Sequence, residues 1–236
     1  MNGTQLALFF VALAPVAQAQ TGVSLMDDRA FVHLMVDEFE FADIADENDF
    51  VWDMDLSMGG DLHKAWMKSR GEQSDTGADQ SEVQLLYSKA VLPFWDLQAG
   101  VRRDLDPGPE RNWATIAIRG LAPYFFDVEA ELFFAEGGQR SIRAKGEYEL
   151  LLTQRLILSP ELEVLAYGRN EPGRLIGSGL SEIEFDVRLR YEIKRELAPY
   201  IGLGWYRLYG ATRDFAKAAG QDGQDVVMSV GVRAWF

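Results

Sequence analysis

Two kinds of side chain in this sequence could bind a soft metal ion, namely the thioether of Met and the imidazole of His. The chain has no Cys and only 2 His, so it lacks a thiolate metal site, a disulfide framework and a cysteine nucleophile. After residue 19, the soft ligands are Met26, His33, Met35, Met54, Met58, His63, Met67 and Met228. Which of them can act together depends on the face of the structural element that each occupies.

His33 and Met35 are two residues apart, so in a β-strand they would share one face with Asp37. The alternate positions hold Val and Leu, which would form an apolar opposite face. Met26 lies just upstream. We hypothesise that Met26, His33 and Met35 form a weak, transient metal-handling cluster. The alternative is that His33 only hydrogen-bonds with neighbouring carboxylates.

The other methionines share their phase with apolar residues. Met54 and Met58 alternate with aspartates, and Met67 falls in phase with His63 and opposite lysines. Met228 lies on a valine face. We interpret these four methionines as apolar surface filler that points away from the charged face.

The elements that carry these residues are predicted to be strands, because alternation with a period of two runs through the chain. Between 181 and 193, Ser, Ile, Phe, Val, Leu, Tyr and Ile alternate with Glu, Glu, Asp, Arg, Arg and Glu. Such alternation is typical of a strand with one polar and one apolar face. It recurs in about twelve segments, at 31–42, 50–59, 62–70, 81–91, 94–103, 112–121, 124–135, 141–152, 155–167, 180–193, 198–208 and 226–236.

The connections between these segments alternate in length. Tight turns at 59–61, 92–93, 122–123, 153–154 and 194–197 separate longer polar loops at 43–49, 71–80, 104–111, 136–140, 168–179 and 209–225. This is the arrangement of an outer-membrane barrel with short periplasmic turns and longer extracellular loops. A soluble sandwich or lipocalin-like barrel also alternates. Aromatic residues near the strand ends favour the membrane, where they would form interfacial girdles. The fold class is therefore predicted as all-β, a single transmembrane antiparallel β-barrel of about 12 strands.

The N-terminus has the features of an export signal. Leu6 to Ala17 is an uncharged apolar run, and Ala17-Gln18-Ala19 fits a small-x-small cleavage pattern. The alternative is a buried N-terminal helix. We predict a signal peptide at 1–19, a short periplasmic segment at 20–30 and the barrel at 31–236.

The charge balance limits the partners. The chain has 37 acidic against 23 basic residues, a formal net charge of −14. This excess argues against nucleic acid, whose phosphates need a basic surface. In a barrel, many of these charges would line the lumen, where acids and bases pair, and the surplus of acids would favour cations.

Several segments resemble the copper resistance protein B family. They are AWMKSRGE at 65–72, GLAPY at 120–124, EGG at 136–138, LLTQRLIL at 151–158, GSGLS at 177–181, LRYEIKRELAPY at 189–200 and DFA at 214–216. Their order and spacing extend the resemblance from Phe31 to Phe236. One departure is that members usually carry a long Met- and His-rich segment before the barrel, whereas residues 20–30 contain only Met26 as a soft ligand.

The resemblance implies a barrel in the outer membrane of a Gram-negative bacterium. It further implies a role in copper tolerance beside a periplasmic multicopper oxidase. On this view the ion at Met26, His33 and Met35 is copper, bound weakly and transiently, and the other partner is outer-membrane lipid.

The sequence also bears on competing functions. A Ser–His hydrolase is disfavoured because both histidines lie near the periplasmic ends of strands and the sequence has no Gly-x-Ser-x-Gly elbow. We therefore expect no enzyme. A general small-solute or cation-selective porin without a copper role stays open, as does a purely structural membrane protein.

Overall fold

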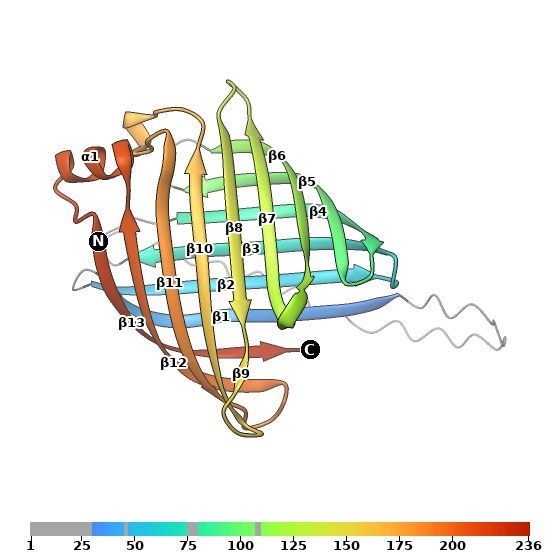
Figure 1. Ribbon diagram of the computed structural model, residues 1–236. Coiled ribbons are helices and arrows are strands. Elements are labelled where there is room, and N and C mark those ends of the chain that lie inside the picture. The colour runs from blue at the N-terminus through green and yellow to red at the C-terminus, as the bar shows by residue number, and fades with distance from the viewer. Residues whose placement is uncertain (1–29, 45–46, 75–79, 107–109) are drawn as a thin grey trace, which may run out of the picture.

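The computed structural model describes residues 30–44, 47–74, 80–106 and 110–236, which form one antiparallel β-barrel (Figure 1). Its strands are β1 (Phe31–Ile44), β2 (Glu47–Gly59), β3 (His63–Ser74), β4 (Gln80–Leu92), β5 (Trp95–Asp106), β6 (Arg111–Ala122), β7 (Phe126–Ala135), β8 (Arg140–Tyr148), β9 (Leu150–Leu151), β10 (Leu156–Tyr167), β11 (Gly179–Tyr191), β12 (Leu197–Leu208) and β13 (Gln224–Trp235). The helical segments are η1 (Pro123–Phe125), η2 (Pro172–Arg174) and α1 (Gly210–Ala218).

The sheet closes because β1 pairs with both β2 and β13. The short β9 continues β8, and both pair with β10, so the 13 segments make 13 − 1 = 12 barrel strands. Closure leaves no open sheet edge, which is the condition for a sheet to span a membrane. The predicted fold class and strand count are confirmed.

The outer face of the barrel is apolar and the inner face is polar. Exposed side chains include Phe41, Val101, Ile201 and Met228, whereas the buried set is dominated by charged and hydroxyl residues. This is the reverse of a soluble protein and matches a barrel whose outer surface meets lipid. Among the described residues, no helix is long and apolar enough to cross a membrane.

The two ends of the barrel differ as the sequence predicts. In Figure 1 the tight turns gather at the end where β1 begins and β13 ends, and α1 lies at the other end. The termini of the barrel are joined there, since Leu34 N donates to Phe236 O over 2.9 Å. We call these ends the turn end and the loop end.

Three exposed aromatic residues form the tips of two tight turns. Phe94, Tyr124 and Phe125 have φ angles of 67°, 68° and 66°. This left-handed conformation is uncommon for residues other than glycine. The sequence placed Tyr124 at the start of a strand, which is wrong, because the turn extends over Pro123–Phe125 and β7 begins at Phe126.

A β-bulge disturbs the alternation of β1. The register against β2 shifts between Val36 and Glu38. The insertion turns both Asp37 and Glu38 to the lumen, where each forms an ion pair. The bulge explains why this strand alternates less regularly in the sequence than the others.

Helix α1 lies within 209–225, which the sequence predicted as a loop. It is held by tertiary contacts, because the buried Thr212 accepts a hydrogen bond from Gly177 N at 2.8 Å and shares one with Ser181 Oγ at 2.6 Å. Ala216 packs one turn further on and is 1% exposed. These contacts come from residues about 30 positions away, which periodicity in a single segment does not reveal.

Replacing Thr212 with Val is expected to loosen α1 and the adjoining loop. Loss of the shared hydroxyl leaves Gly177 N and Ser181 without their partner, at a cost of about 1–3 kcal/mol. Amide hydrogen exchange of α1 should accelerate by about tenfold or more, while Thr212→Ser, which keeps the hydroxyl, should retain protection. Unchanged exchange in Thr212→Val would contradict this role for Thr212.

Candidate functional site

The lumen is the candidate site, because the polar faces of nearly all strands converge in it. On β11, for example, the inward row runs from Glu182 to Arg190 and is entirely charged, while the outward row from Ile183 to Tyr191 is apolar or aromatic. Inward and outward rows alternate because successive side chains of a strand point to opposite faces. The lumen therefore holds acids and bases from all sides of the barrel.

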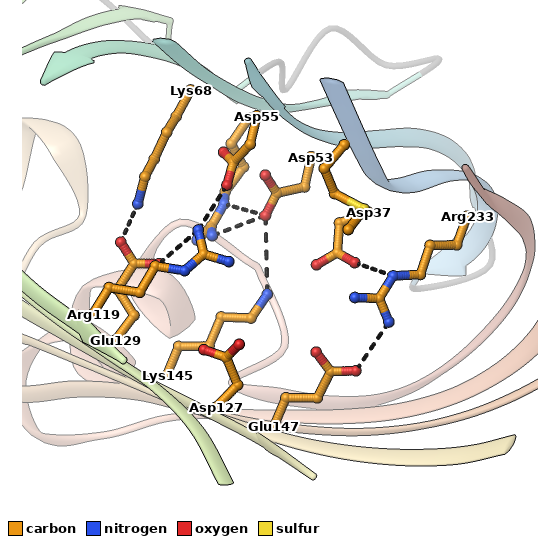
Figure 2. A pocket seen from close by; sticks show the side chains of 12 residues that line it. Asp37, Asp53, Asp55, Lys68, Arg119, Asp127, Glu129, Lys145, Glu147 and Arg233 are labelled. Carbon is orange, nitrogen blue, oxygen red and sulfur yellow. Dashed lines mark hydrogen bonds and ion pairs between the residues drawn. The ribbon is translucent and has the colours of Figure 1, made fainter. Parts of the chain in front are cut away.

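Ion pairs cross the lumen between strands that are not neighbours. We call the level of Asp55, Lys68, Arg119 and Glu129 the waist. Lys68 on β3 contacts Glu129 on β7, and Arg119 on β6 donates to Asp55 on β2 over 2.9 Å (Figure 2). These contacts cross the lumen, since the paired strands are four positions apart in the sheet and their partners are 61 and 64 residues apart in sequence. We call the ion-paired side chains that cross the lumen bars.

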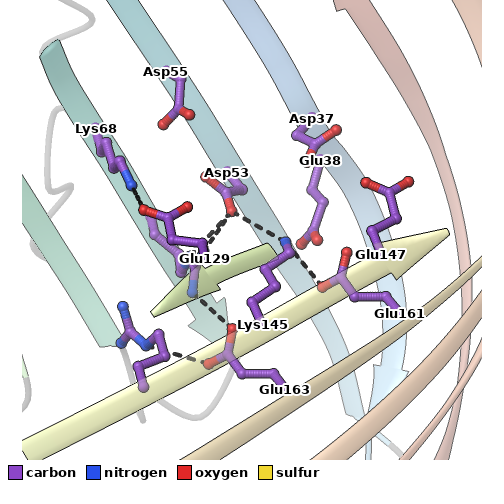
Figure 3. A network of polar contacts seen from close by, with 12 residues as sticks. Asp37, Glu38, Asp53, Asp55, Lys68, Glu129, Lys145, Glu147, Glu161 and Glu163 are labelled. Carbon is purple, nitrogen blue, oxygen red and sulfur yellow. Dashed lines mark hydrogen bonds and ion pairs between the residues drawn. The ribbon is translucent and has the colours of Figure 1, made fainter. Parts of the chain in front are cut away.

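A second group of bars meets at Asp53. Arg70 lies 2.9 Å from Asp53 and 3.0 Å from Glu163, so it connects β3 with both β2 and β10. Lys145 on β8 reaches Glu161 at 2.9 Å and Asp53 at 3.9 Å (Figure 3). Each base thus pairs with two acids. This pairing offsets the free-energy cost of removing the charges from water.

Further ion pairs continue this pattern toward both ends. On the turn-end side of the waist, Arg233 contacts Asp37 at 2.7 Å and Glu147 at 3.4 Å. Nearer the loop end, Arg143 and Arg102 both bind Glu82, at 2.8 and 2.7 Å. The sequence-based expectation that most lumen acids pair with bases holds for these residues.

A cavity of 60 Å³ remains among the bars at the waist. Its lining residues, drawn in Figure 2, include Met35, Asp37, Asp55 and Arg119. The space admits only a few water molecules. The ion pairs around this cavity occupy part of the lumen at this level.

Three acids on β11 are not neutralised in this way. Glu182, Glu184 and Asp186 point into the lumen toward its loop end, and none of them forms an ion pair with a basic side chain of the described residues. Their inward phase matches the sequence-based expectation. An acid-rich wall above the waist attracts cations and repels anions.

The structure places His33 and Met35 on the same inward face but in different spaces. Met35 lines the waist cavity, and His33 lines a second cavity of 270 Å³ at the turn end, together with Lys64 and Trp66. The His33 ring stacks on Trp235 with centroids 6.1 Å apart. Within the described residues it makes no hydrogen bond to a carboxylate, so the alternative reading of His33 as a carboxylate partner is not seen.

Met26 and the signal-peptide residues lie outside the described residues, so the cluster of three ligands and the division at 19 and 30 stay predictions. Among the described residues, no group of three or more His, Asp or Glu side chains could hold a metal ion.

The other soft ligands lie where the phase analysis predicts, although Met54 is half-buried on the face of β2 that also carries Met58. Met58, Met67 and Met228 are 56%, 44% and 67% exposed on the outer face. His63 is also exposed and hydrogen-bonds with the hydroxyl of Tyr87. These side chains belong to the lipid-facing surface and do not reach the lumen.

Sequence reasoning missed several members of the ion-pair layer. Arg70, Arg119 and Glu163 were not singled out as lumen residues, although each occupies a charged position in the alternating pattern of its strand. Their inward phase could have identified them as lumen residues. Their partners could not have been identified, because contact across a barrel depends on its diameter and stagger.

A closed 12-strand barrel with an apolar outer face and a charged lumen defines this chain as an outer-membrane β-barrel protein. Solved structures agree on the fold. This chain is similar to the KdgM porin, with a TM-score of 0.54 and 14% identity, and the match covers 86% of this chain and 99% of that chain. It is also similar to the NanC porin, with a TM-score of 0.57 and 10% identity over the same shares.

The sequence comparisons identify the family. Residues 30–236 match the copper resistance protein B precursor (CopB) family. Copper resistance protein B of Escherichia coli is 43% identical over 91% of this chain and 73% of its own length. A copper resistance protein B homolog of Pseudomonas syringae pv. tomato is 39% identical over 94% and 76%. The chain belongs to the copper resistance protein B family, and its relatives and fold indicate a non-enzymatic protein of the outer membrane.

Proposed function

We propose that this barrel passes copper ions across the outer membrane through its lumen, by transient separation of the ion pairs at the waist. The family assignment supports a role in copper resistance. The acid-rich wall on β11 would gather cations at the loop end. His33 and Met35 would then serve as weak ligands between the waist and the periplasm, with Met26 as a third.

The observation that carries this proposal is the position of Met35. Its side chain lines the waist cavity together with Asp37 and Asp55, so a soft thioether lies among hard carboxylates there. Thioether and imidazole ligands prefer Cu(I), whereas carboxylates suit harder ions. His33 lies two residues closer to the turn end. One soft ligand therefore lines the waist cavity, and the other lines the cavity at the turn end.

Copper titration of the refolded barrel tests the ligand role. Replacing Met35 with Leu or His33 with Ala is expected to weaken Cu(I) binding by about tenfold each, because each removes one of two or three soft ligands. Met67→Leu, on the outer face, is the matched control and should bind as the wild type does. Identical binding by all four proteins would remove the cluster.

A periplasmic multicopper oxidase is proposed as the partner at the turn end. The support is the row of exposed turn tips, in which Phe94, Tyr124 and Phe125 are 75%, 83% and 77% exposed. Aromatic side chains are enriched at protein interfaces, and holding three of them in a left-handed backbone conformation costs stability. Cross-linking from position 124 in intact cells, compared with a position in a loop at the other end, would test this contact.

A general small-solute or cation-selective porin is the competing function. It is favoured by the porin-like fold and opposed by the bars across the waist. In cells, a deletion strain should become sensitive to copper and change its cell-associated copper. Unchanged tolerance and unchanged copper content would leave the porin reading as the better one.

A further inference from the structure

One feature of the barrel plays no part in the lumen. Arg140, the first residue of β8, lies on the outer face at the loop end. Its phase is that of Ile142, which is 43% exposed to lipid, and opposite to that of Ser141 and Arg143 in the lumen. Its cross-strand neighbour is Phe134 on β7, which is also exposed. An arginine thus stands at the edge of the apolar outer wall.

Arg169 approaches the same place from the end of β10. Its Nη1 donates to Gly137 O over 3.0 Å, in the hairpin that joins β7 to β8. Figure 1 shows this hairpin at the loop end of the barrel. Both arginines are exposed, and neither forms an ion pair with an acidic side chain of the described residues. Glu136, in the same hairpin, is exposed and forms no ion pair with either arginine.

A buried glutamine holds the two arginines together. Gln139 is 3% exposed. Its Nε2 donates to Arg169 O over 3.0 Å, and its Oε1 accepts from Arg140 N over 3.1 Å. Gly168 N also donates to Arg140 O at 2.8 Å. These bonds fix the two backbones beside each other, so both arginine side chains start from neighbouring points of the loop end.

Gly168 keeps the outer side of Arg140 open. A Cβ at that position would lie 3.4 Å from the Cβ of Arg140. With no side chain at Gly168, only backbone lies against Arg140 on this side. Below it, Leu132, Phe134, Ile142 and Leu162 form an exposed apolar wall of β7, β8 and β10. The surface therefore combines unneutralised guanidinium groups with a hydrocarbon-compatible face.

We propose that Arg140 and Arg169 bind the phosphate of lipid A, the phosphorylated glycolipid of the outer leaflet. Guanidinium groups match phosphate oxygens in a bidentate geometry. The loop end faces the outer leaflet, where the acyl chains would lie along the apolar wall and the phosphate would meet the arginines. The site is independent of the copper role and depends only on placement in the outer membrane.

Another outward-facing arginine is already paired with an acid and serves as a comparison. Arg103 lies on the outer face of β5 toward the loop end, and it contacts Glu110. Its charge is balanced within the protein. It is therefore a matched control that shares the position and side chain of the proposed site but lacks the free charge.

Native mass spectrometry of the full barrel, refolded with bisphosphorylated lipid A or with its dephosphorylated form, tests the proposal. The wild type is expected to retain the phosphorylated lipid about tenfold better or more, since hydrogen bonds between charged groups are the strong ones. The double variant Arg140→Gln/Arg169→Gln should lose this preference. Arg103→Gln, and Arg155→Gln at the turn end, should keep it.

Folding is checked separately, because heat-modifiable migration on gels reports barrel closure in every variant. Equal retention of both lipids by the wild type would overturn the proposal. So would a folded double variant that still prefers the phosphorylated lipid, or a loss as large in Arg155→Gln as in the double variant.

Discussion

Replacing Arg143 with Met is expected to lower the free energy of unfolding by about 3–5 kcal/mol, the usual cost of removing one partner of a buried ion pair. Arg143 lies 2.8 Å from Glu82, 3.2 Å from Glu163 and 3.4 Å from Glu131. Its loss would leave the buried Glu82 and Glu131 and the half-buried Glu163 with too few bases. Urea unfolding of the barrel in lipid vesicles, followed by tryptophan fluorescence, measures the effect.

Arg103→Met provides the matched control for this stability prediction. Its ion pair with Glu110 is exposed, with 51% and 56% of the two side chains accessible, so its removal should cost less than about 1 kcal/mol. Adding Glu82→Gln to Arg143→Met should restore part of the loss. A cost for Arg143→Met as small as that for Arg103→Met would show that the lumen network contributes little to stability.

Removing two bars at the waist is expected to open the lumen. The double variant Arg70→Ala/Lys145→Ala deletes the bases that hold Asp53, Glu161 and Glu163. Less side-chain volume and unbalanced acids should raise single-channel conductance in planar bilayers several-fold and shift the reversal potential toward cations. The wild type should conduct little.

Lys64→Ala is the control for the conductance prediction. Lys64 sits at the turn end and contacts Asp96 at 3.6 Å, away from the waist. Its removal should leave conductance unchanged. If the wild type already conducts as strongly as the waist variant, the ion pairs do not close the lumen.

The strands and their two faces could be predicted from the sequence because each depends on local alternation. His33 and Met35 were expected to face inward, and Met58, Met67 and Met228 outward, and the structure agrees. An alternating strand offers only two choices of face, so phase alone decides them.

The partners inside the lumen could not be predicted. Strict alternation puts Glu38 on the outer face with Val36, and only the bulge at that point turns it inward to meet Arg188 at 2.7 Å. Pairs such as Lys68 with Glu129 join walls that are far apart in sequence. Their choice follows from barrel stagger and tertiary packing, which leave no local signal.

The charge excess has different consequences in the two halves of the lumen. At the waist, acids and bases pair and neutralise each other. Above it, Glu182, Glu184 and Asp186 face the lumen without ion pairs to described bases. Such an arrangement would draw cations to the waist. Passage there would depend on a cation that competes with the Arg and Lys side chains for the paired acids. This makes the lumen a selective path in our account, and it separates the proposal from a general porin.

The most direct test follows copper entry into liposomes that carry the purified barrel and an enclosed copper-sensitive dye. The same liposomes are assayed for swelling in arabinose. We predict copper entry well above that of protein-free liposomes, slowed in Met35→Leu, together with no sugar-driven swelling. Swelling in arabinose, or copper entry no faster than through lipid alone, would contradict the account.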